Sequence, residues 1–266
     1  MNATALPPVG NLLREWRQRR RLSQLDFAVE AEISSKHLSF LETGRSRPSR
    51  EMLLKLAELL EVPLRERNTL LISAGFAPMF SERKLDDPSL QAAREAMELV
   101  LKGHEPYPAI AVDRHWTLLA ANRAVAPMLT DIKSELLAPP MNVLRASLHP
   151  DGLAPRIVNL AQWRAHIFAR LRRQIEISAD PVLTALLEEL TSYPAPEHPA
   201  RSGNDGEATN AFVVPMRLAT PMGVLSFIST TTVFGTPIDV TLSELALESF
   251  FPADAATATA LRQMPL

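Results

Sequence analysis

Two short helical patterns joined by a tight turn fill residues 22–48, and they constrain the fold more than any other stretch of the sequence. Ser23, followed three residues later by Asp26, is typical of the N-terminus of a first helix. Ser34 is the expected N-cap of a second helix, which Gly44 ends. The segment therefore predicts a helix-turn-helix.

The second of these helices is expected to be apolar on one face and polar on the other. Leu38 and Leu41 form its apolar face and are predicted to be buried together with Ile33 from the turn and Ala28 from the first helix. The opposite face carries short, polar or basic side chains, namely Ser35, Lys36, His37 and Ser39. A helix of this kind fits the major groove of DNA.

Charge is distributed unevenly along the chain. The formal net charge is −2, but residues 14–50 contain nine Lys or Arg and five Asp or Glu, whereas residues 81–266 contain 16 basic and 21 acidic residues. A local excess of positive charge is the electrostatic requirement for contact with phosphates. We therefore assign the expected double-stranded DNA partner to the N-terminal part.

The flanking sequence predicts three further helices. Apolar residues at helical spacing in 9–21 indicate an amphipathic first helix, Ser49 caps a fourth, and a fifth begins at Pro63 and ends at Gly75. In order and spacing, the strings SQLDFA, ISSKHLSFLETGRSRPS and LLKLAELLEVP resemble the Cro/CI or XRE class. The resemblance implies an all-α, five-helix, lambda-repressor-like DNA-binding domain.

One residue departs from the pattern of that class. Members usually have Gly at the turn between the two motif helices, where this chain has Glu32. A non-glycine residue with positive φ costs about 1–2 kcal/mol, so we expect a slightly strained turn and an intact motif.

The resemblance also implies which residues contact DNA. Ser35, Lys36 and Ser39 would read bases, with His37 and Phe40 at the margin of the interface. Contacts to phosphates would come from Gln24, Thr43, Arg45 and Arg47. Taken singly, the charged residues favour a solvated face, and only the motif around them points to DNA. Phe40 is equally compatible with packing against the fourth helix.

A charged stretch at residues 81–87 has no apolar periodicity and is the expected domain boundary. We predict an N-terminal domain at 1–80, a linker and connecting helix at 81–105, and a C-terminal domain at 106–266. The connecting helix begins at Pro88 and has an apolar face that includes Val100. It could pair with its copy in a dimer or cover the second domain.

The C-terminal part predicts two strands, then helices, then three strands. The strands are expected in 109–112, 116–120, 211–218, 224–234 and 243–251, and two long helical stripes lie between the second and third of them. Asn122 is the expected cap of the helix after the second strand, and Pro215 indicates an edge strand or a bulge. Residues 193–206 are expected to form an exposed loop. The first long helix should be polar outside, with Arg164, Arg170, Arg172 and Arg173.

This order predicts an α+β, five-stranded antiparallel sheet with helices on one face, similar to a PAS-like domain. Local strings such as HEPYPAIAVDRHWTLLAANRA, NVLRASLHPDGLAPRIVNLAQWRAH and DPVLTALLEELTSYP resemble the MmyB-like bacterial transcriptional regulators over residues 10–253. The resemblance implies a PAS-like domain that encloses a small lipophilic molecule, such as a fatty acid, and passes its presence to the DNA-binding part.

Candidate pocket residues follow from this resemblance and from composition. Trp163, Ile167, Leu171 and Phe227 are expected either to line an apolar cavity or to fill an ordinary core. For a ligand carboxylate the candidates are Arg145, His149 and Arg170, although taken singly the arginines favour a solvated charge and His149 a role in the turn HPDG.

Composition argues against several other functions. The chain has no Cys, its six His show no metal-ligand spacing, and it has no Gly-rich phosphate loop or GxSxG motif. We therefore expect no catalysis, no metal and no cofactor beyond an apolar ligand. No apolar run has the length of a membrane span, so we expect no membrane contact and a cytoplasmic location.

These observations predict a DNA-binding regulator that senses a small apolar ligand. A homodimer is expected because one short helix reads too few base pairs for useful specificity. Two alternatives remain at this point: a regulator whose second domain binds a protein and no small molecule, and an enzyme tethered to DNA.

Overall fold

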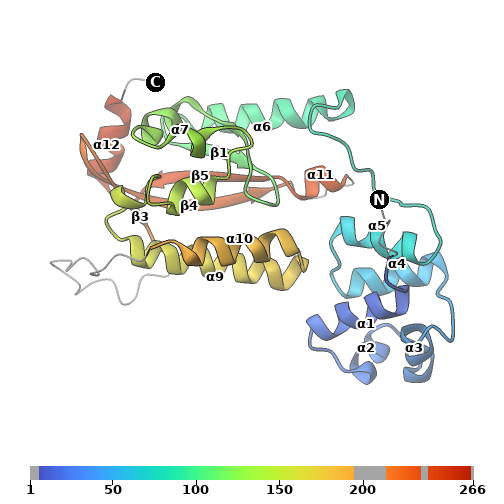
Figure 1. Ribbon diagram of the computed structural model, residues 1–266. Helices are drawn as coiled ribbons and strands as arrows, with labels where there is room; N and C mark the ends of the chain where they lie inside the picture. The colour runs from blue at the N-terminus through green and yellow to red at the C-terminus, as the bar shows by residue number, and fades with distance from the viewer. Residues whose placement is uncertain (1–5, 195–213, 235–238, 265–266) are drawn as a thin grey trace. The chain divides into compact units, whose positions relative to one another are not determined.

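The computed structural model describes residues 6–194, 214–234 and 239–264, and the chain divides into two compact units (Figure 1). The helices of the N-terminal unit confirm the predicted five-helix arrangement. They are α1 (Val9–Arg19), α2 (Gln24–Glu30), α3 (Ser35–Glu42), α4 (Arg50–Leu59) and α5 (Leu64–Ser73).

Serine caps set where three of these helices begin. The hydroxyls of Ser23, Ser34 and Ser49 each accept a hydrogen bond from the backbone N–H three residues later, at 3.1 Å in every case. Each bond satisfies one of the N–H groups that a helix N-terminus leaves without an intrahelical partner. The predicted helix starts are confirmed at all three positions.

The turn between α2 and α3 is left-handed at Glu32, whose φ is 57°. The Ile33 N–H donates to the Ala28 carbonyl at 2.9 Å, and the Glu32 N–H donates to the Val29 carbonyl at 3.1 Å. This pair of bonds is a Schellman motif, which closes a helix by satisfying its last carbonyls. The motif therefore forms without the usual glycine, as expected from the sequence.

Close packing of α1 against the end of α3 fixes the position of the motif. Leu13, Phe27, Leu38 and Leu41 are completely buried in the core of this unit. A Cβ atom added at Gly10 would lie 2.4 Å from the Leu41 carbonyl oxygen, well inside van der Waals contact. Only glycine therefore allows α1 to approach α3 this closely.

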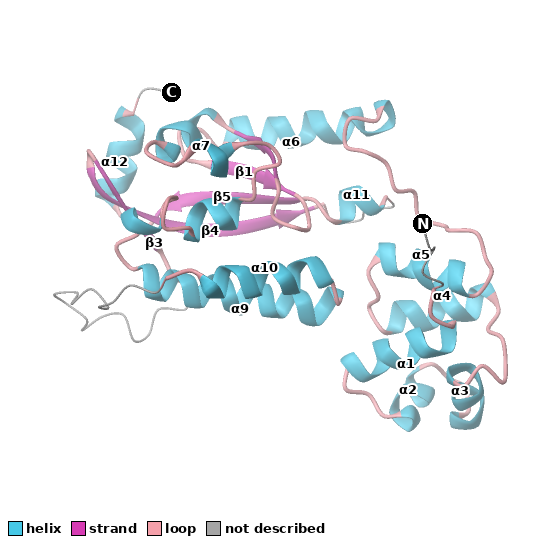
Figure 2. Cartoon of the chain, in the orientation of Figure 1, coloured by secondary structure: helices cyan, strands magenta, loops and turns pink. Residues whose placement is uncertain are grey.

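The C-terminal unit is built on a five-stranded antiparallel sheet with the order β2-β1-β5-β4-β3 (Figure 2). Strand β3 lies at an edge of the sheet, which is one of the two alternatives predicted from Pro215, and it begins directly after that proline. The strands are β1 (Ala109–Val112), β2 (Leu118–Ala121), β3 (Met216–Thr220), β4 (Gly223–Val233) and β5 (Ala246–Pro252).

Helices of several lengths complete the fold. The α-helices are α6 (Gln91–Gly103), α7 (Ser134–Leu137), α8 (Val143–Leu148), α9 (Leu160–Ser178), α10 (Pro181–Ser192), α11 (Val240–Ser243) and α12 (Ala255–Gln263). The 3-10 helices are η1 (Pro88–Leu90), η2 (Arg123–Leu129) and η3 (Ala154–Arg156). None of the described helices combines the length and the apolar composition that a bilayer crossing requires.

The prediction that helices cover one face of the sheet is wrong. Helix α6 packs Met97 and Leu101 against Ala109, Ala111 and Leu247 on one face, and Figure 1 shows the sheet between α6 and the α9–α10 pair. All four residues of β1 are buried, because alternate residues of the strand face opposite layers. Val100, expected on the apolar face of α6, is instead exposed.

Arg164 corrects the prediction of a wholly polar outer face on α9. The side chain is buried, and its guanidinium donates to the carbonyls of Pro194 at 2.7 Å and Tyr193 at 3.0 Å. These carbonyls lie just beyond the C-terminus of α10, where positive charge is favourable. Arg172 and Arg173 are exposed, as predicted.

Asn122 begins η2 but its side chain does not cap it. The amide oxygen accepts a bond from the Ala109 N–H at 3.0 Å, and the amide nitrogen donates to the carbonyls of Leu101 at 3.1 Å and Tyr107 at 2.8 Å. This buried amide therefore ties the end of α6 to the start of β1. Most of the predicted loop at 193–206 and the predicted turn at 235–237 lie outside the described residues.

We expect Gly10→Ala to lower the free energy of unfolding of the N-terminal unit by about 1–3 kcal/mol, because the new methyl group overpacks the contact with α3. Gly103→Ala in α6 is the matched control, since nothing lies within 4 Å of a Cβ there. It should leave stability unchanged or raise it by up to about 1 kcal/mol. Thermal unfolding followed by circular dichroism measures both effects, and equal stability of the two variants would contradict the prediction.

Candidate DNA-binding helix and ligand pocket

Within the N-terminal unit, the polar face of α3 carries exposed and half-buried side chains that a partner could contact. Ser35 and Lys36 are exposed, while His37 and Ser39 are half-buried on the same face. Thr43, Arg45 and Arg47 follow as exposed residues at the end of the helix and in the loop after it. The structure therefore groups these seven predicted residues at one surface, and their contact with DNA stays a prediction.

Phe40 lies at the margin of this surface and is half-buried. The Lys36 ammonium lies 5.7 Å from the centre of its ring, and the Arg45 guanidinium lies 5.8 Å from it. Cations at this distance are attracted to the face of an aromatic ring. Phe40 therefore lies beside two of the predicted DNA-contacting residues and helps to orient them.

A buried carboxylate joins α3 to α1 and α2. Glu42 accepts bonds from the Arg17 guanidinium at 2.6 and 3.0 Å and from the Gln24 amide at 2.7 Å. Burial alone would raise the pKa of Glu42, but the hydrogen bonds from Arg17 and Gln24 outweigh it and hold the pKa below its ordinary value. Gln24, predicted to contact phosphate, thus takes part in this internal network. Sequence reasoning did not identify Glu42 as the centre of this network.

An apolar pocket lies between the sheet and the helices on one side of it, and it holds about 880 Å³ of empty space, including the part open to solvent. Four of the predicted residues line it: Trp163, Ile167, Arg170 and Phe227. Leu171 is completely buried in the adjoining core and lies outside the lining.

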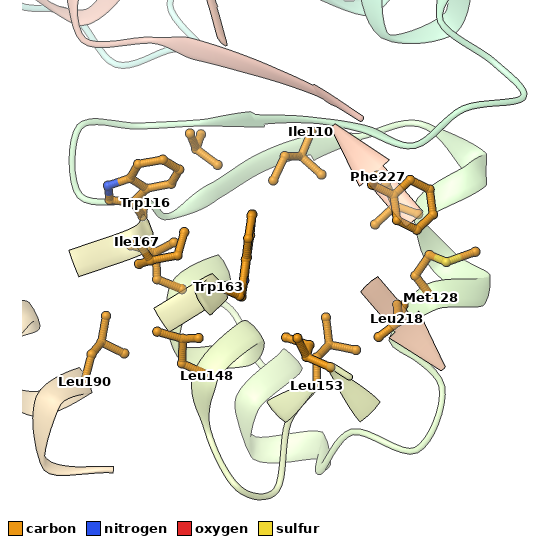
Figure 3. Packing of buried hydrophobic residues seen from close by; sticks show 14 of the residues in the cluster. Ile110, Trp116, Met128, Leu148, Leu153, Trp163, Ile167, Leu190, Leu218 and Phe227 are labelled. Atoms are coloured by element: carbon orange, nitrogen blue, oxygen red, sulfur yellow. The ribbon is translucent and has the colours of Figure 1, made fainter. Parts of the chain in front are cut away.

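Trp163 occupies the middle of this region. Figure 3 shows its indole between Trp116 and Ile167 on one side and Phe227 and Met128 on the other. The indole N–H donates to the Ser147 hydroxyl at 3.0 Å, which satisfies its one polar group. Its ring stacks on His166 at 5.4 Å, and burial together with the nearby Arg170 lowers the pKa of that histidine. The wall around Trp163 is therefore largely uncharged.

Two of the predicted carboxylate-binding residues lie outside the pocket lining. Arg145 is exposed and forms two hydrogen bonds of 2.7 Å with Glu189. The His149 Nδ1 accepts a bond from the Asp151 N–H at 3.0 Å, and its ring lies edge-on to Tyr193. Both side chains therefore stabilise local structure around α8 and α10.

Arg170 points into the pocket lining and not outward as the helical pattern predicted. Its guanidinium forms a two-point ion pair with Glu248 on β5, one bond of which measures 2.9 Å. The guanidinium also lies 4.4 Å from the centre of the Trp116 ring. Sequence reasoning missed Glu248, although one acidic residue within the apolar strand segment ALESFF was a signal that could have identified it.

No group of three or more His, Asp or Glu side chains within the described ranges is arranged to hold a metal ion.

Comparison with protein-family models gave two matches. Residues 8–70 match a helix-turn-helix domain, and residues 93–264 match the MmyB-like transcription regulator ligand binding domain. A comparison with curated proteins found no match.

We expect Glu42→Ala to lower the free energy of unfolding by about 3–5 kcal/mol, because Arg17 would remain buried without its charged partner. Glu32→Ala is the matched control, since it removes the exposed ion pair with Lys55 and should have a much smaller effect. Chemical denaturation of both variants checks the difference. A Glu42 variant as stable as the Glu32 variant would show that the buried pair does not stabilise the motif.

Proposed function

Because the chain belongs to the MmyB-like transcription regulators, we propose that it binds specific DNA sites through α3 and that a small lipophilic molecule in the pocket controls this binding. The family models support a ligand-responsive, DNA-binding regulator. The observation that carries the proposal is the apolar pocket in a chain that also presents a polar, basic helix face.

The proposed division of roles on the DNA follows from side-chain chemistry. Lys36 can donate to guanine O6 and N7, and Ser35 and Ser39 can donate or accept at base edges. Arg45 and Arg47 lie in the basic loop after α3, where they would contact phosphates and so position the helix without reading sequence. Thr43 and His37 complete the interface at its edges.

The regulator is proposed to act as a homodimer. A single recognition helix contacts few base pairs, and two copies on successive half-sites supply the specificity that one lacks. A ligand that favours one arrangement of the dimer by about 1–3 kcal/mol would change DNA affinity roughly 5- to 150-fold. Binding and release of DNA then need no catalysis.

The ligand is proposed to have a long apolar chain, as a fatty acid or related acyl compound has. Ile110, Met128, Ile167 and Phe227 supply an apolar wall that such a chain can contact along its length. The alternative is a C-terminal domain that binds a protein partner. A concave apolar pocket between the sheet and the helices favours a small molecule, because a protein partner would use an exposed apolar surface.

Lys36→Ala should weaken binding at one or two base positions by about 1–3 kcal/mol, because a base contact is lost, whereas Arg47→Ala should weaken binding to every sequence alike. Gel-shift titrations against an operator and its single-base variants measure both effects. Equal losses on all sequences for the two variants would remove Lys36 from the base-reading set.

Native mass spectrometry of the purified full-length protein, followed by solvent extraction, should reveal a bound apolar molecule. Ile167→Trp should reduce its occupancy about tenfold or more, because the larger side chain fills the pocket. Val182→Trp, at an exposed position of α10, is the control and should retain the molecule. An empty wild-type pocket that also takes up no added fatty acid or ester would favour the protein-partner alternative.

A further inference from the structure

A polar patch interrupts the apolar lining of the pocket. Arg170 reaches it from α9, Glu248 from the central strand β5, and Ser229 from β4. Thr231 lies opposite Glu248 in the β4–β5 pairing and two residues after Ser229, so the three strand residues share one face of the sheet. The polar end of a ligand in the pocket would form its contacts at this patch.

The two charges in this patch are already paired with each other. The two terminal nitrogens of Arg170 donate to the two carboxylate oxygens of Glu248, and one of them also donates to the Thr231 hydroxyl at 2.6 Å. That hydroxyl donates in turn to Glu248 at 2.8 Å. Glu248 is only 2% exposed, so water cannot replace these bonds if they break.

This pairing determines what charge a ligand can bring. Among the described residues that line the pocket, Arg170 is the only cation. A ligand carboxylate that bound the guanidinium of Arg170 would have to displace Glu248. Glu248 would then be a buried anion without a partner, and it would lie beside a second anion. A neutral oxygen requires no such displacement, because three of the five guanidinium N–H groups serve Glu248 and Thr231 and the others remain able to donate.

We infer that the pocket selects a lipophilic ligand whose polar end is uncharged, such as an ester, an amide or an alcohol, and that Glu248 is the residue that excludes carboxylates. The Ser229 hydroxyl and the free N–H groups of Arg170 hydrogen-bond the neutral oxygen, while the apolar chain extends past Trp163 and Phe227. This inference rests on the proposed function, and it narrows the acyl ligand proposed there from a free fatty acid to an uncharged derivative in the same pocket.

The test compares decanoate with methyl decanoate, which have the same chain and differ in head-group charge. Binding of each to the full-length protein is measured by isothermal titration calorimetry at about pH 8, where a free carboxyl is ionised. The wild type should bind methyl decanoate at least about tenfold more tightly than decanoate. Glu248→Gln keeps the shape of the side chain but leaves Arg170 positive, so decanoate affinity should rise about tenfold or more.

Glu189→Gln is the matched control, because Glu189 forms a similar two-point pair with Arg145 outside the pocket lining. It should leave both affinities unchanged. Wild-type preference for decanoate would overturn this inference and leave the proposed function standing. Failure of the wild type to bind either compound would overturn both. If Glu248→Gln does not fold, the wild-type comparison alone decides.

Discussion

The alternation of side chains along β5 is the constraint on which the C-terminal unit depends. This strand lies between β1 and β4, so its backbone is hydrogen-bonded on both sides. Its side chains must therefore pack against two different layers, one on each face of the sheet. Leu247 packs toward α6, whereas Glu248 and Phe250 face the pocket. A shift of one residue would place a carboxylate in the α6 layer and a leucine at the polar patch. The register of one strand thus fixes both the fold and the chemistry of the site.

In the N-terminal unit the comparable role belongs to Glu42. Its carboxylate collects donors from α1 and α2, and the absence of a side chain at Gly10 lets α1 approach the same end of α3. The polar groups inside the bundle therefore hydrogen-bond one another at the buried side of α3. The exposed side of α3 carries Lys36 and serines with short side chains. Their hydrogen-bonding groups are then available to base edges.

Local chemistry made much of this fold predictable. The serine caps, the apolar periodicity of α9 and α10 and the proline before β3 each act over a few residues, and the structure agrees with them. Arg164, Asn122 and Arg170 were misplaced because their partners lie far away in sequence. A helical pattern identifies which face an arginine occupies, but it cannot identify a distant carboxylate or carbonyl that makes burial of that arginine favourable. For the same reason Glu42 and Glu248 were not identified as site residues.

The pocket also has an energetic consequence for signalling. Its walls include side chains of β1, β4, β5 and α9. Side chains that line empty space lack dispersion contacts, and a bound apolar chain would restore them. A ligand stabilises the state it binds in proportion to its affinity and concentration, and it shifts a conformational equilibrium only by the difference between its affinities for the two states. A ligand that merely filled the cavity equally well in both states would stabilise the domain without regulating DNA binding. Regulation by a ligand in this pocket would therefore require that the pocket lining differ between the two states.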